Sequence, residues 1–207
     1  MNKNILNTGV QDFISENLST DIMSVLLKKP IFDTVSNTEL VQQIEAKKKS
    51  KKKLPTWFAN SKIYYPKKLN IEQTSSEITA RYKSQIVSGK SLVDLTGGFG
   101  VDSYFFSKKI ADVFHCEIDK KLSEIAAHNF EVLDAENIVT LPMDGISFLL
   151  REKSRFDWLY IDPSRRNDVK GKVFQLSDCL PDVPKHLELL FSRSDAILIK
   201  TSPLLDL

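Results

Sequence analysis

Short apolar runs alternate with amphipathic stretches from residue 91 to residue 200, and this alternation constrains the fold more than any other feature of the sequence. Such a pattern is typical of β-α units, whose right-handed crossovers give a mostly parallel sheet with helices on both faces. We expect strands at 91–95, 112–118, 137–141, 156–161 and 195–200, with helices at 101–109, 119–134, 144–152 and 180–193. The sequence therefore predicts an α/β fold with a Rossmann-like sheet.

The residues before this sheet divide into two parts. Apolar positions recur at helical spacing from Val10 to Leu26, and Ser36 with Glu39 forms a capping-box pattern for a helix that starts near Asn37. We predict a small helical domain over 1–53, a basic and aromatic connection over 54–90, which is irregular as far as residue 72, and the Rossmann-like core over 91–207.

A lysine-rich segment runs from residue 47 to residue 68, with nine lysines and no acid, although the whole chain has a net charge of only +2. This segregation favours a surface that binds a polyanion, with Lys51, Lys52 and Lys53 as candidate ligands; a solvated helix end or a linker is the alternative. The aromatic residues in or beside the segment can stack on bases or pack against a neighbouring domain: Trp57, Tyr64 and Tyr65.

The first strand of the sheet ends in an acid, and the chain then turns through glycines into a helix: Val93-Asp94-Leu95-Thr96-Gly97-Gly98-Phe99-Gly100-Val101-Asp102. Glycine allows a ligand to approach the backbone closely and allows the positive φ angles of a tight turn. A tight turn without a ligand is the alternative.

The second and third strands also end in acids. Glu117 is placed to accept hydrogen bonds from ribose hydroxyls, whereas Asp119 is the better candidate for capping the next helix. Asp144, followed by Gly145, can meet an adenine amino group or cap its own helix. Because the carboxyl ends of parallel strands share one edge, these residues predict a nucleoside-binding site there.

At these positions the chain resembles the class I methyltransferases, which use S-adenosylmethionine. Their first motif has the form acid-x-glycine-x-glycine-x-glycine, and Thr96 stands where the first glycine is usual. The absence of a glycine at Ser103 argues against a dinucleotide dehydrogenase. The cofactor-binding residues implied are Asp94, Thr96, Gly97, Gly98, Gly100, Glu117, Ile118, Asp144 and Gly145.

The fourth strand ends in Asp162-Pro163-Ser164-Arg165-Arg166. This matches the position of Asp/Asn-Pro-Pro-aromatic in methyltransferases that act on exocyclic or amide nitrogens, so Asp162, Pro163 and Ser164 are the implied catalytic residues. Ser164 replaces the second proline, and Arg165 replaces the aromatic residue. Arg165 and Arg166 can stack on a base, bind phosphate or form surface salt bridges.

More narrowly, the chain resembles bacterial methyltransferases that carry a THUMP-like domain and are distantly similar to RNA-cap guanine-N2 methyltransferases. The resemblance rests on Lys53-Leu54-Pro55-Thr56-Trp57, on Glu72-Gln73-Thr74-Ser75-Ser76-Glu77 with Ala80 and Tyr82-Lys83, and on the two strand-tip motifs above. It implies RNA as the substrate, and it implies that residues 73–77 fold over the cofactor. A complete class I sheet has seven strands, so we expect a fragment that ends after strand five.

Other features exclude some classes of protein. The distant Cys116 and Cys179 suggest neither a disulfide nor a zinc site, and Cys116 is expected to be buried in its strand. No run of about 18 apolar residues and no secretory signal is present, which predicts a cytoplasmic protein. Two alternatives to an RNA methyltransferase remain open: a nucleic-acid-binding protein with a decayed methyltransferase fold, and a methyltransferase for a protein or a small molecule.

Overall fold

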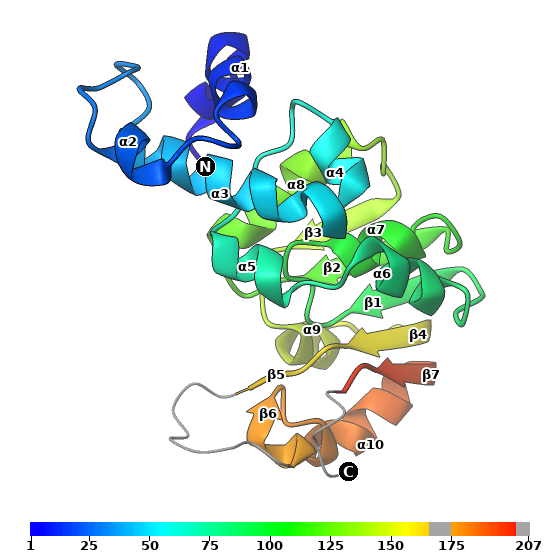
Figure 1. Cartoon of the computed structure of the whole chain (residues 1–207). Coiled ribbons are helices and arrows are strands. Elements are labelled where there is room, and N and C mark those ends of the chain that lie inside the picture. Colours follow the sequence, from blue (N-terminus) through cyan, green and yellow to red (C-terminus); the bar gives the residue numbers. More distant parts are fainter. Residues whose placement is uncertain (166–174, 202–207) are drawn as a thin grey trace.

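The computed structural model of the chain describes residues 1–165 and 175–201, apart from the side chain of Arg165 (Figure 1). A parallel sheet lies at its centre, with the strand order β3-β2-β1-β4-β7. The strands are β1 (Ser91–Asp94), β2 (Asp112–Cys116), β3 (Ile138–Leu141), β4 (Phe156–Ile161) and β7 (Ser194–Ile199). All five predicted strands are therefore confirmed, and so is the α/β class. The strand order reverses at β1, which makes the β1–β4 crevice the expected ligand site of this topology.

The four predicted helices between the strands are also present. They are α7 (Val101–Phe106), α8 (Lys120–Val132), α9 (Gly145–Arg151) and α10 (Val183–Arg193). Helices α9 and α10 pack through Leu149 and Leu190 against one face of the sheet, whereas α7 packs through Phe106 against the other. The sheet is thus covered on both faces, which leaves its carboxyl edge for function.

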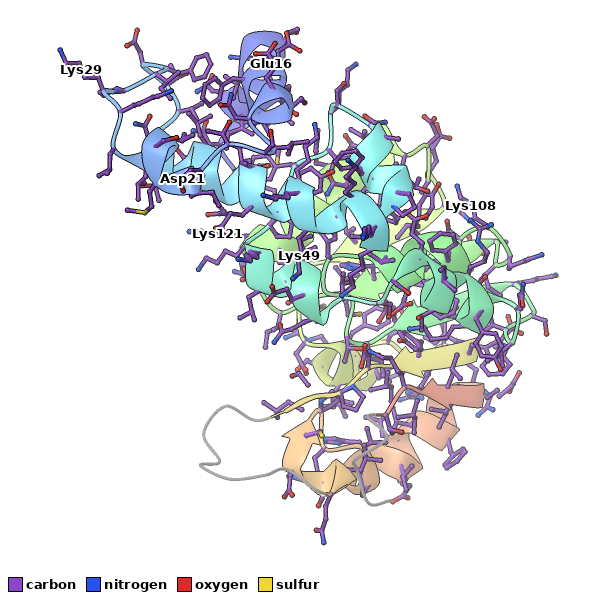
Figure 2. All side chains as sticks on the ribbon, viewed as in Figure 1. Glu16, Asp21, Lys29, Lys49, Lys108 and Lys121 are labelled. Atoms are coloured by element: carbon purple, nitrogen blue, oxygen red, sulfur yellow. The ribbon has the colours of Figure 1, made fainter. Side chains whose placement is uncertain are left out.

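The N-terminal helices extend from the α7 and α8 side of the sheet. They are η1 (Lys3–Leu6), α1 (Thr8–Glu16), α2 (Ile22–Leu26) and α3 (Asn37–Lys53). The predicted capping box is present at the start of α3, with Ser36 and Glu39 bonded reciprocally. Figure 1 shows α1 and α2 at the end of α3 that is remote from the sheet, and Figure 2 marks that end by Glu16, Asp21 and Lys29.

One apolar cluster joins these helices to the sheet domain. Ile14 and Ile44 belong to the same cluster as Trp57, Phe99 and Leu122. The boundary proposed at residue 53 is therefore crossed by a continuous core, and the division into separate domains stays a proposal.

The segment over 54–72 is more regular than predicted. It contains α4 (Pro55–Ala59) and α5 (Lys68–Gln73), and α6 (Glu77–Ser84) follows. Pro55 occupies the first turn of α4, where its fixed φ favours a helix and its missing N–H costs nothing. The irregular connection predicted over 54–72 is therefore found only over 60–67, because Pro55 starts a new helix where it was expected to end order.

A small two-stranded ladder follows the fourth strand of the main sheet. β5 (Ser164–Arg165) pairs antiparallel with β6 (Cys179–Leu180), after the short helix η2 (Leu176–Asp178). Arg166 lies outside the described residues. No helix among residues 1–165 and 175–201 is long and apolar enough to span a membrane.

Candidate active site

The loop after β1 is shaped from inside by Asp94, whose side chain is buried. One of its oxygens accepts a hydrogen bond from the Ser103 hydroxyl at 2.7 Å, and the other accepts from the backbone N–H of Thr96 at 3.1 Å. Burial raises the pKa of Asp94 to about 7, although these hydrogen bonds and the charge of Lys83 act in the opposite direction. Asp94 therefore fixes the path of the loop, and its carboxylate does not face solvent.

The three glycines of this loop are required for different reasons. A Cβ at Gly97 would lie 2.3 Å from the His115 ring, and one at Gly100 would lie 2.4 Å from the Phe130 ring. Gly98 has a φ of 55°, but a Cβ there would meet no atom closer than 3.8 Å. Packing thus explains Gly97 and Gly100, whereas Gly98 borders open space that a ligand can occupy.

Glu117 braces the glycine loop from the tip of β2. Its carboxylate accepts hydrogen bonds from the backbone N–H groups of Gly98 at 2.8 Å and Asp119 at 2.7 Å. Partial burial raises the pKa of Glu117, and the two N–H groups oppose that rise. The next residue, Ile118, exposes 72% of its surface. A partly exposed acid and an exposed apolar side chain therefore lie together beside the glycine turn.

The acids expected to cap helices do so. Asp119 caps α8 through the N–H groups of Lys121 and Leu122, and Asp144 caps α9 through the N–H of Ser147 at 2.7 Å. Gly145 lies so close to Leu95 that a Cβ would be 2.5 Å from its carbonyl oxygen. The capping alternative for Asp144 is thus confirmed for one of its oxygens.

A cavity of about 330 Å³ opens beside Asp144. Ile146 lines it from α9, and Leu180, Pro181 and Lys185 line it from the β6–α10 region. The cavity therefore places apolar and charged groups next to the tip of β3, where a nucleobase was expected.

A side chain from the first strand tip holds the fourth. The Thr96 hydroxyl accepts a hydrogen bond from the backbone N–H of Asp162 at 2.7 Å. Glycine at position 96 has no atom that can make this contact. The departure from the usual glycine therefore supplies a link between the β1 and β4 loops.

The Asp162 carboxylate forms an ion pair with Lys200, which follows β7, at 2.6 Å. The two side chains expose 28% and 35% of their surfaces, so solvent reaches the pair. Burial raises the pKa of Asp162, and the hydrogen bond from Lys200 is the largest opposing influence. Pro163 is partly buried, and the Ser164 hydroxyl lies 3.5 Å from the Leu180 carbonyl oxygen. Lys200 was not predicted as a site residue.

A buried polar network lies behind the pair. The Lys83 ammonium contacts Asp102 at 2.6 Å, the Ser75 hydroxyl at 2.9 Å and the Tyr160 hydroxyl at 2.5 Å. Ser75 and Tyr160 each donate to the same Asp102 oxygen at 2.9 Å. The network ties the segment before α6 to α7 and β4. Ser75, Lys83 and Asp102 lie in the motifs noted in the sequence, but nothing local indicated that they meet.

The motifs around residues 53–57 and 72–77 are joined by direct contacts. Glu77 accepts hydrogen bonds from the Thr56 N–H at 2.6 Å and from its hydroxyl at 2.8 Å. The Lys53 ammonium donates to the backbone carbonyls of Ile71 and Glu72 at 2.9 and 2.7 Å. The segment that was expected to cover the cofactor is thus anchored at both ends.

Several lysines of the segment 47–68 contact other groups of the chain. Lys47 is buried and its ammonium donates a hydrogen bond to the Ser15 hydroxyl, and the Lys53 ammonium donates to backbone carbonyls. Lys49, labelled in Figure 2, forms an ion pair with Glu72, and Lys68 forms one with Glu45. Both acids lie just outside the segment. Several of the nine lysines therefore serve packing and helix contacts, and polyanion binding by the segment stays a prediction. Lys48, Lys51 and Lys52 remain exposed at the end of α3.

The aromatic residues of the same segment do not stack outward. Trp57 is fully buried, with its ring 5.0 Å from Tyr104 and 6.2 Å from Phe99, measured between centroids. Tyr64 and Tyr65 are buried as well. Base stacking by these three residues was wrong, and packing against the neighbouring unit is confirmed.

Comparison with solved structures found proteins with a similar fold. The chain is similar to a crystal structure described as a "putative methyltransferase" from Porphyromonas gingivalis W83, with 29% identity and a TM-score of 0.81. The match covers 99% of this chain and 50% of that one, so the chain spans half the length of its structural relative. The fold is that of a Rossmann-like methyltransferase domain.

Other solved structures are more distantly similar. A "putative RNA methyltransferase" from Pyrococcus horikoshii has 20% identity and a TM-score of 0.46, covering 71% of this chain and 74% of that one. A "putative methyltransferase" from Streptococcus mutans in complex with SAH has 16% identity and a TM-score of 0.41, covering 55% and 65%. Comparisons with protein-family models and with curated proteins found no match.

Proposed function

We propose that the chain binds S-adenosylmethionine at the carboxyl edge of β1, β2 and β3 and transfers its methyl group to a nitrogen of an RNA base. The observation that carries the proposal is the convergence of the open Gly98 turn, Glu117 and the Asp162–Lys200 pair on one edge of a sheet with a methyltransferase fold. The proposed setting is the cytoplasm.

The cofactor fits the residues at the first three strand tips. Open space at Gly98 admits a ligand against the backbone, and the partly exposed Glu117 carboxylate can accept hydrogen bonds from two ribose hydroxyls. Ile118 offers an apolar surface for a base, and the free acceptor capacity of Asp144 suits an amino group. When bound, S-adenosylmethionine supplies an electrophilic methyl group on a sulfonium.

The fourth strand tip supplies the groups that orient the acceptor. An exocyclic amine of a base is a weak nucleophile because its lone pair is delocalised into the ring. Hydrogen bonds from that amine to the Asp162 carboxylate and the Pro163 carbonyl would hold the lone pair towards the methyl group, while the carboxylate offsets the positive charge that develops on nitrogen. Ser164 follows these residues on β5, with its side chain exposed. Asp162, Pro163 and Ser164 are the proposed catalytic residues.

RNA is the proposed substrate because exposed lysines remain beside this edge. Lys48, Lys51 and Lys52 lie on the last turns of α3, and Lys53 anchors the segment that leads into α6. Ammonium groups in such a cluster neutralise phosphates without reading sequence. Arg165 and Arg166 remain proposed contacts to the same substrate, and membership of the THUMP-like family remains a hypothesis.

The test separates cofactor binding from methyl transfer. Titration calorimetry of the chain with S-adenosylmethionine, S-adenosylhomocysteine and NAD should give binding of the first two only. Transfer of labelled methyl groups to total RNA, to total protein or to neither then decides the acceptor class. Binding without transfer to RNA or protein would favour a decayed enzyme or a small-molecule acceptor, and binding of NAD alone would refute the proposal.

A further inference from the structure

The strongest unassigned feature of the candidate site is the position of Lys200. Its backbone N–H donates to the Ile161 carbonyl at 2.9 Å, which continues the pairing of β4 with β7 one residue beyond the strands. Lys200 is thus held beside Asp162 by the sheet itself, and its ammonium reaches one carboxylate oxygen at 2.6 Å. This contact differs from a chance surface ion pair, because the pairing of β4 with β7 already fixes both backbones. Only side-chain entropy is lost when the two groups meet.

The pair leaves one side of Asp162 available. The backbone N–H of Asp162 is engaged by Thr96, and Lys200 contacts Oδ2 only. No hydrogen bond to Oδ1 is found within the part of the chain that the structure describes. The side chain is 28% exposed, and Oδ1 keeps its capacity to accept a hydrogen bond from a substrate.

We propose that Lys200 is a positioning residue for the methyl transfer: it holds one oxygen of Asp162, keeps the carboxylate charged and turns the other oxygen towards the target amine. This inference rests on the proposed function. A protonated carboxyl group carries an O–H in place of one acceptor, and it cannot offset positive charge on the reacting nitrogen. Lys200 therefore acts through Asp162, without itself contacting the reacting atoms.

Charged groups other than Lys200 also act on the Asp162 carboxyl group. Lys83 of α6 favours the charged carboxylate, whereas Asp102 of α7 disfavours it. Those two groups already contact each other at 2.6 Å and largely neutralise one another. Burial lowers the pKa of Lys53 of α3, and the nearby charge of Lys200 lowers it further. Lys200 is the cation with a direct bond to Asp162 among the described residues.

Three variants test the inference. Lys200→Met removes the ammonium and keeps the length of the side chain, and Lys200→Arg keeps the charge and the donor. Lys109→Met is the matched control, since it changes an exposed lysine that precedes the amino end of β2. The first measurement is the titration of the Asp162 carboxyl carbon by NMR in the S-adenosylhomocysteine complex, with the signal assigned from Asp162→Asn.

Loss of an ammonium within hydrogen-bond distance should raise the Asp162 midpoint by about one pH unit or more, whereas Lys200→Arg and Lys109→Met should leave it near the parent value. The acid limb of the pH–rate profile for methyl transfer should move up by the same amount in Lys200→Met alone. Affinity for S-adenosylhomocysteine should stay within about twofold in all three variants, which corresponds to less than 0.5 kcal/mol.

Two outcomes would overturn the inference: an unchanged Asp162 titration in Lys200→Met, or a raised KM for RNA with an unchanged acid limb. The second would mean that Lys200 binds substrate phosphate directly. A parent chain that transfers no methyl group would refute the proposed function instead, and the NMR titration would still decide whether Lys200 holds the carboxylate.

Discussion

The hydroxyl of Thr96 accepts a hydrogen bond from the backbone N–H of Asp162, with 2.7 Å between oxygen and nitrogen. This contact joins the glycine loop after β1 to the loop after β4, across the crevice where the strand order of the sheet reverses. The proposed cofactor site and the proposed acceptor site are therefore mechanically linked. The Thr96 contact adds to the backbone hydrogen bond from the Leu95 N–H to the Tyr160 carbonyl, which joins the same two strands at 3.0 Å.

Thr96→Val should uncouple the two loops, because it keeps the shape of the side chain and removes the acceptor. An unpaired, partly buried N–H costs about 1 to 3 kcal/mol, so we expect lower stability and roughly tenfold slower methyl transfer. Thr96→Ser keeps the hydroxyl and should stay close to the parent. Urea unfolding and single-turnover rates provide the measurements, and parent-like rates in Thr96→Val would show that the link is dispensable.

Glu117→Ala should weaken S-adenosylhomocysteine binding at least tenfold. The change removes a charged acceptor for ribose and the brace on the Gly98 N–H, and a hydrogen bond to a charged group is worth about 1.5 to 3 kcal/mol. Glu131→Ala, an exposed acid on α8, is the control. Calorimetry gives both dissociation constants; equal values in the two variants would remove Glu117 from the cofactor site.

The exposed lysines at the end of α3 should give RNA binding a strong dependence on salt. If about four cations contact phosphates of single-stranded RNA, the slope of log affinity against log salt is near −3. Alanine at Lys48, Lys51 and Lys52 should flatten that slope, whereas alanine at Lys90, Lys109 and Lys153 should not. Fluorescence anisotropy with a labelled RNA measures both. Identical slopes in the two triple variants would leave the first three lysines as a solvated helix face.

These lysines also illustrate how far the sequence could predict the site. The five strands and the helices between them followed from local apolar patterns, because burial on a sheet needs those patterns. The glycine turn and the acids at the strand tips could be identified because each directly follows a predicted strand. The contacts of Lys53 and Lys200 were not predicted, because Lys53 binds carbonyls eighteen or more residues away and Lys200 meets Asp162 only through the β4–β7 pairing. Local sequence carries no record of such non-local contacts.

Asp94 should make the stability of the chain depend on pH. Its pKa is about 7 in the folded chain and near 3.8 when exposed, so the folded state binds the proton more tightly. The resulting stabilisation is present below about pH 4 and is lost as the pH rises to about 7. Asp94→Asn lacks this term, so the parent should lose stability relative to the variant across that interval.

The buried His115 opposes this trend in both proteins. Burial lowers the pKa of His115 to about 4, so its neutral form gives stability that increases between about pH 4 and pH 6.5. Because His115 is common to parent and variant, the difference between their unfolding free energies isolates Asp94. Urea unfolding at about pH 5 and about pH 7 provides that difference. A difference that does not change with pH would mean that Asp94 is ionised throughout.

The last prediction concerns the role of the Asp162 carboxylate, which we expect to align the target amine without first removing its proton. Alignment needs an acceptor oxygen, whereas general-base catalysis needs a group that can take up a proton. Asn at position 162 supplies the first and not the second. Asp162→Asn should therefore retain measurable activity, and it can still accept a hydrogen bond from Lys200.

Asp162→Ala should lose roughly two to three orders of magnitude in turnover, as expected when a preorganised electrostatic partner is removed. Affinity for S-adenosylhomocysteine should change little in either variant, because the cofactor groups lie on the first three strands. Single-turnover methyl transfer to RNA, with calorimetry alongside, separates the two effects. Parent rates in Asp162→Ala would exclude the residue from the reaction. Equal and complete loss in both variants would instead favour Asp162 as a general base, because an acceptor oxygen at position 162 would then not be enough for catalysis.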